Sequence, residues 1–143
     1  MSRTSAALRS LAFAAAALGA LAAFAQEPAK PDAVAYIISP ADGATVSNPV
    51  TVRFGLRGMG VAPAGVERPD TGHHHLLIDV DQLPPPGAPV PMDDKHRHFG
   101  AGQTEVTLDL APGKHTLQLL MGDHMHVPHN PPVVSERITI TVK

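Results

Sequence analysis

The chain has 143 residues, with no cysteine, nine histidines and only four Phe and one Tyr. The absence of cysteine excludes disulfides, thiolate metal sites and cysteine nucleophiles. Once Arg3 and Arg9 are set aside, nine Lys and Arg face thirteen Asp and Glu, so a nucleic-acid partner is not expected.

The N-terminus has the pattern of an export signal. Two arginines precede an uncharged apolar run over residues 11–24, which is too short to span a bilayer and ends in Ala23-Phe24-Ala25. We therefore expect a signal peptide over residues 1–25 and a mature chain that begins at Gln26. The product would be periplasmic or secreted, with no membrane insertion after cleavage.

Residues 26–33 are expected to form a short flexible leader, because they are polar and contain two prolines. Residues 34–143 are expected to form a single domain, in which apolar residues alternate with polar ones in segments bounded by Pro and Gly. The segments with this strand pattern are 34–38, 50–56, 73–80, 105–110, 115–121 and 137–142.

Six to seven short strands of this kind predict an all-β fold, an immunoglobulin-like antiparallel β-sandwich. Two connections, 58–72 and 81–103, are longer than hairpins need, and function on such a scaffold usually lies in its long loops.

Eight of the nine histidines fall into three groups, and each group contains a pair spaced i, i+2. In an extended chain such a pair projects from one face, with Cα atoms roughly 6.5 Å apart. Neutral imidazoles are ligands of copper and zinc. We rank four histidines first as metal ligands and take three histidines and a methionine as alternates: His73, His75, His98 and His126, then His96, His124, His129 and Met125.

Two histidines have simpler interpretations. His115 follows a Pro-Gly turn on the apolar face of its strand and is interpreted as structural. His74 shares parity with Leu76 and Ile78, so it is expected to point inward, opposite to His73 and His75. For the remaining histidines, hydrogen bonds to loop carbonyls are the alternative to metal binding.

Simple alternation of strand direction would place the first and third histidine groups at opposite ends of the sandwich. The proline-rich segment 81–95 offers a way back, because fifteen residues at about 3.1 Å each can run the length of a strand. We therefore predict that this segment crosses the domain and that the three groups share one site.

Three motifs resemble a bacterial exported family, domain of unknown function 4399. They are Gly72-His73-His74-His75-Leu76-Leu77-Ile78-Asp79, His98-Phe99-Gly100-Ala101-Gly102-Gln103-Thr104-Glu105 and Pro112-Gly113-Lys114-His115-Thr116-Leu117-Gln118-Leu119. The likeness covers about residues 37–142 and implies a small periplasmic β domain. It implies no established activity.

Three functions remain open at this point. The first is a periplasmic metal-binding protein, with copper favoured and zinc possible, that serves as a carrier, buffer or resistance factor. The alternative is a non-catalytic structural or adhesion module that binds another envelope protein. A metalloenzyme would need an open coordination position, which the sequence does not reveal, and an enzyme is not the expectation.

Overall fold

The computed structural model describes residues 25–143, and the expected signal peptide lies almost wholly outside this part of the chain. Nine strands and no helix occur in the described part. None of its segments is a helix long and apolar enough to cross a bilayer.

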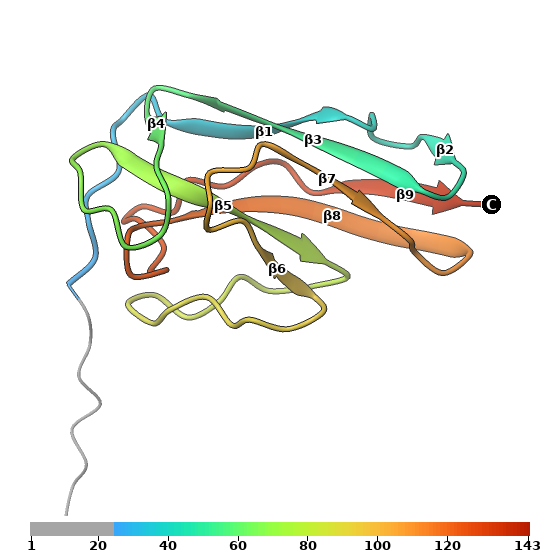
Figure 1. Ribbon diagram of the computed structural model, residues 1–143. Helices are drawn as coiled ribbons and strands as arrows, with labels where there is room; N and C mark the ends of the chain where they lie inside the picture. The colour runs from blue at the N-terminus through green and yellow to red at the C-terminus, as the bar shows by residue number, and fades with distance from the viewer. Residues whose placement is uncertain (1–24) are drawn as a thin grey trace, which may run out of the picture.

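The strands form two sheets that pack face to face (Figure 1). The smaller sheet has the order β1-β3-β7 and the larger has the order β2-β9-β8-β5-β4, with β6 paired to β5 outside this path. Most pairs are antiparallel, but the short strands β2 and β4 pair in parallel with β9 and β5. The bounds are β1 (Val34–Ser39), β2 (Thr45–Val46), β3 (Val50–Arg57), β4 (Gly60–Val61), β5 (Thr71–Ile78), β6 (His96–His98), β7 (Glu105–Leu108), β8 (Gly113–Gly122) and β9 (Ile138–Val142).

The core lies between the two sheets and follows from the period-two pattern. Alternate residues of each strand point inward, so an alternating sequence supplies one apolar face per strand. Val52 and Phe54 of β3 pack with Leu117 and Leu119 of β8 and with Ile140 of β9, all at most 4% exposed. The predicted all-β sandwich is confirmed.

Strand β5 is covered on both faces, which is unusual for a sandwich strand. His74, Leu76 and Ile78 face the core, while Leu77 packs on the outer side in a second apolar cluster with Val90 and Leu120. Val90 belongs to the proline-rich segment that follows β5 and runs back beneath the larger sheet (Figure 1). This segment therefore gives β5 a second buried face.

The sequence missed three strands, β2, β4 and β6, each only two or three residues long. A period cannot be recognised in so few residues, and their pairing depends on neighbours far along the chain. The expected flexible leader pairs with the domain, since Ala29 N donates to Asn130 O at 3.1 Å and Asn130 N donates to Glu27 O at 2.9 Å.

Candidate metal centre

Strand β5 supplies the two central histidines of the site. His73 and His75 are two residues apart, so both point to the outer face, away from the sandwich core. His74 points the opposite way and packs on Phe54, with ring centroids 5.2 Å apart. All three are fully buried, and the predicted split between His74 and its neighbours is confirmed.

Strand β6 brings the second histidine group back along β5. Strand β6 pairs antiparallel with β5 in a register that puts His98 opposite His75 and His96 opposite Leu77. Phe99 N donates to His74 O at 3.1 Å and continues this pairing. His98 therefore lies opposite His75. The predicted crossing by residues 81–95 is wrong, because Lys95 lies at the end of β5, where Ile78 N donates to Lys95 O at 2.8 Å, and it is β6 that carries His98 back.

The third group arrives from the end of β8. This strand is antiparallel to β5, and Gly122, its last residue, lies opposite His73. A tight turn follows, in which Asp123 Oδ1 accepts hydrogen bonds from Met125 N at 2.8 Å and Val127 N at 2.9 Å. The turn places His126 over the outer face of β5, with a left-handed φ of 67° that a non-glycine residue rarely adopts.

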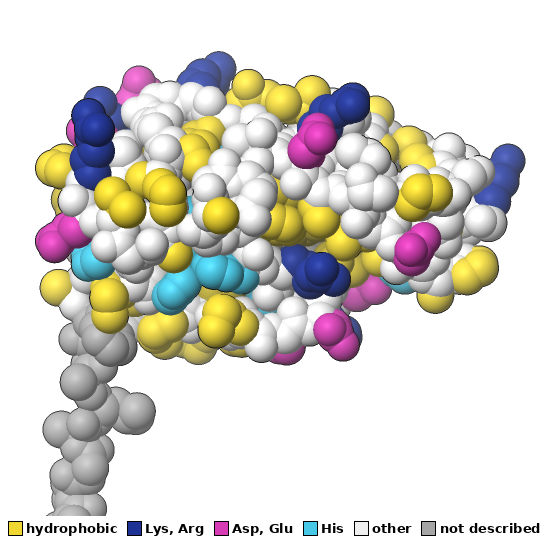
Figure 2. Space-filling view, in the orientation of Figure 1, with side chains coloured by type: hydrophobic (Ala, Val, Ile, Leu, Met, Phe, Trp, Pro, Cys, Tyr) yellow, Lys and Arg dark blue, Asp and Glu magenta, His cyan; other side chains and the backbone are white. Residues whose placement is uncertain are grey.

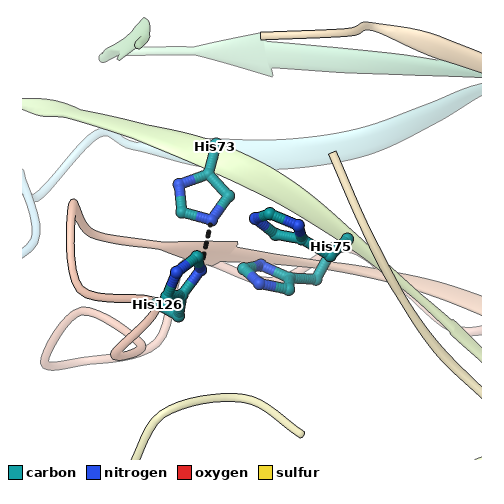
Figure 3. Close-up of side chains that lie close together, drawn as sticks. His73, His75 and His126 are labelled. Atoms are coloured by element: carbon teal, nitrogen blue, oxygen red, sulfur yellow. Dashed lines mark hydrogen bonds between the residues drawn. The ribbon is translucent and has the colours of Figure 1, made fainter. Parts of the chain in front are cut away.

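The result is a compact group of four imidazoles, His73, His75, His98 and His126, which we call the histidine cluster. One nitrogen from each ring lies within 4.8 Å of the others. His73 Nε2 and His126 Nδ1 are 3.1 Å apart and share a hydrogen bond, and Figure 3 shows these two rings and His75 turned toward one another. Tetrahedral coordination at about 2.0–2.1 Å would place the ligating nitrogens about 3.4 Å apart, so a modest contraction would close the group on an ion.

Two glycines make room for the rings. A Cβ at Gly122 would lie 2.7 Å from Cε1 of His75, and one at Gly100 would lie 2.5 Å from Nε2 of His98. Real Cβ atoms essentially never come so close, so any side chain at either position would push a cluster histidine away. The glycine at each position is therefore explained by the packing of the rings.

Burial favours the neutral form of His75 and His98. The pKa of His75 is lowered to about 3, chiefly by burial and then by repulsion from His73, His98 and His126; the nearby Leu120 backbone opposes this weakly. The pKa of His98 is lowered by burial and by His126. Neutral imidazole is the form that binds a metal, so these two rings are in the competent state at neutral pH.

Several nitrogens of the cluster have no hydrogen bond of standard geometry. Within residues 25–143, His73 Nδ1, both ring nitrogens of His75 and His98 Nε2 are buried without a partner, and so are both ring nitrogens of His74 and of His129 outside the cluster. Buried polar atoms are nearly always paired, and a group that is not calls for an explanation such as an ion.

The cluster reaches the surface on one side. His98 and His126 are partly exposed while His73 and His75 are not. The space-filling view has a patch of histidine side chains with hydrophobic side chains around it (Figure 2). An ion could therefore approach through the partly exposed pair.

The structure thus brings together the four histidines that the sequence ranked first. The alternates lie elsewhere: His96 Nδ1 is 2.8 Å from Asp93 Oδ1, and His124 Nδ1 is 3.7 Å from Glu27 Oε1. His129 is buried beside Gly72, outside the four-histidine group. Met125 is exposed.

His115 is held by two hydrogen bonds, from Nδ1 to Asp79 Oδ2 at 2.8 Å and from Nε2 to Ala111 O at 2.7 Å. These contacts agree with the structural role expected for it.

Sequence reasoning missed Asp123 and the two cluster glycines, and no local signal would have found them, because each matters through contacts with residues far away in the chain.

Fold and cluster together define a small β-sandwich domain with a histidine-lined candidate metal centre on the outer face of one sheet. Residues 52–143 match the family described as Domain of unknown function (DUF4399), and the chain belongs to this family. The matched range includes all four cluster histidines. The chain matches no curated protein and no solved structure.

Proposed function

We propose that this protein binds a transition-metal ion through His73, His75, His98 and His126. The observation that carries the proposal is the convergence of four imidazoles from three separate segments to within 4.8 Å. Hydrophobic packing gives no reason to gather four polar rings on the outer face of a sheet, because burying unpaired nitrogens costs free energy. A shared ion would compensate that cost.

Copper is the favoured ion and zinc the second. The cluster offers nitrogen ligands only, and for such a site the affinity of divalent ions rises to Cu(II) and falls again at Zn(II). The four methionines of the described chain do not change this expectation: Met92 and Met125 are exposed, Met121 is in the core and Met59 packs against it. We therefore expect Cu(II) to outcompete Zn(II) at equal free concentration.

The role we propose is that of an exported carrier, buffer or resistance factor, and no catalytic step is assigned. Four protein ligands would fill a tetrahedral site, whereas catalytic metals keep a position for water or substrate. The export signal in the sequence supports a periplasmic or secreted location. Intact-mass analysis of periplasmic material should give a chain that begins at Gln26, and a full-length cytosolic chain would contradict the proposed location.

A structural or adhesion module is the second candidate, and one contact favours it. The His73–His126 hydrogen bond is what a purely structural histidine group would form. Under this alternative the cluster holds the 123–127 turn against β5 and takes up no ion.

Metal titration by calorimetry of untagged, metal-free protein separates the two candidates. Saturable binding of one Cu(II) per chain is expected at neutral pH, with weaker binding of Zn(II). The double variant His73→Ala/His75→Ala should lose this binding, while His115→Ala and His96→Ala should keep it. Because the double variant removes two buried side chains, His98→Ala, which alters a partly exposed residue, is measured beside it.

No saturable uptake by the wild-type protein, or equal losses from His98→Ala and His115→Ala, would favour the structural module.

A further inference from the structure

Asp123 is the one acidic side chain that is buried among residues 25–143, and it lies at the histidine cluster. It is 2% exposed and directly follows Gly122, the residue paired with His73. Its carbonyl oxygen also accepts a hydrogen bond from His126 N at 3.0 Å. Asp123 is therefore tied through the backbone to two of the four cluster histidines.

The turn alone does not require a negative charge. Asp123 Oδ1 accepts from Met125 N and Val127 N, and the neutral carbonyl of an asparagine side chain could accept both bonds as well. Burying a carboxylate is costly unless a positive charge or strong hydrogen bonds compensate it. The hydrogen bonds explain the side-chain oxygen, and a cation nearby would explain why the side chain carries a charge.

The cluster supplies no negative charge of its own. Its four rings are uncharged when they bind a metal, so a divalent ion would bring two positive charges into a largely buried site. Asp123 is buried at the start of the turn that carries His126, and the residue before it pairs with His73.

We propose that Asp123 is the counter-charge of the metal centre, a positioning residue that makes the cluster selective for a divalent over a monovalent cation. This inference rests on the proposed function and adds an electrostatic role to it. Coulomb energy is proportional to the charge of the ion, so Asp123 stabilises Cu(II) or Zn(II) about twice as much as Cu(I) in free-energy terms.

The test is the variant Asp123→Asn, which keeps the two acceptor contacts and removes the charge. Asp93→Asn is the matched control, because Asp93 Oδ1 accepts from Lys95 N and His96 N in the same kind of turn, on the surface and outside the cluster. Asp123→Ser is made in parallel as a second neutral variant, since a hydroxyl can also accept a turn hydrogen bond.

Asp123→Asn should weaken Cu(II) and Zn(II) binding about 10- to 100-fold, as is typical when a group that supports metal ligands is replaced. The losses for the two ions should be equal, because both are divalent, whereas a displaced ligand would alter them unequally. Cu(I) should lose only about 3- to 10-fold. The Cu(II)/Cu(I) potential should therefore rise by about 30–60 mV, since 59 mV corresponds to tenfold for one electron.

Asp93→Asn should leave both affinities and the potential unchanged. The role of Asp123 would be overturned if Asp123→Asn and Asp123→Ser bind Cu(II) and Zn(II) within twofold of the wild type, or if the potential does not change. The proposed function would still stand after either result. Failure of the wild-type protein to bind Cu(II) or Zn(II) would overturn the proposed function, and this inference with it.

Discussion

His73 and His126 are 53 residues apart in the sequence and share a hydrogen bond of 3.1 Å between Nε2 and Nδ1. One of these nitrogens donates its proton and the other accepts it, so a hydrogen bond joins the two rings in the metal-free protein. The same two atoms cannot both hold an ion while this proton lies between them. Metal binding through them therefore replaces the hydrogen bond.

Replacing His126 should remove a ligand without disturbing the turn. Asparagine tolerates the left-handed φ of 67° at this position better than most residues do, so His126→Asn keeps the backbone while it removes the imidazole. We expect Cu(II) affinity to fall at least about tenfold, since one of four nitrogen ligands is lost. Calorimetry measures the change.

The neighbouring variant Met125→Ala is its control, because Met125 is exposed and outside the cluster. Equal affinities for the two variants would remove His126 from the ligand set.

A single methyl group at Gly100 should displace His98. The added Cβ would overlap Cε1 of the ring and lie 2.5 Å from its Nε2. Gly100→Ala is therefore expected to weaken Cu(II) binding about tenfold or more while the domain stays folded. Calorimetry and circular dichroism are the measurements.

Gly60→Ala is the matched control for this variant, because its Cβ would be in ordinary contact with Thr71 at 3.4 Å. If both alanine variants bind like the wild type, His98 is not held in place by Gly100 as the structure implies.

Metal-free protein should lose stability as the pH falls below 7. The pKa of His74 is lowered from 6.5 to about 4, chiefly by burial. Between pH 6.5 and pH 4, His74 binds a proton in the unfolded chain but not in the folded chain, so acid favours unfolding. The stability is present above pH 6.5 and is lost as the pH approaches 4, by about 2 kcal/mol between pH 7 and pH 5 for one such histidine.

His73 and His75 act in the same direction, because their pKa values are also lowered. The pKa of His115 is raised by its hydrogen bond to Asp79, so its contribution has the opposite sign. Urea unfolding in a chelating buffer at pH 7, 6 and 5 measures the sum. A free energy of unfolding that does not change over this range would contradict the prediction.

Val90 should couple the proline-rich segment to the cluster. Its side chain is 3% exposed against Leu77 and Leu120, and its backbone N donates to His126 O at 2.9 Å. Val90→Ala is expected to destabilise the domain by about 2 kcal/mol through lost apolar burial. Amide exchange should also become faster for this segment and for the 123–127 turn.

Leu83→Ala, in the same segment but 37% exposed, is the control for this variant and should change neither property. Unaltered exchange in the turn after Val90→Ala would show that the segment and the turn move independently.

The sequence by itself determined the long strands and the histidine pairs. Alternating apolar residues such as Leu117 and Leu119 predict a strand from neighbours alone, because successive side chains point to opposite faces. The same rule correctly separated His73 and His75 from His74. Strand parity together with motif position also ranked first the four histidines that form the cluster.

Only the tertiary structure decided how these parts meet. His98 comes to His75 through the antiparallel pairing of β6 with β5, and β6 is too short to have a recognisable period. Asp123 has no local pattern that distinguishes it from the other acidic loop residues. Its burial beside His73 depends on the antiparallel register of β5 and β8, and that register is set by packing between segments nearly fifty residues apart rather than by adjacent residues.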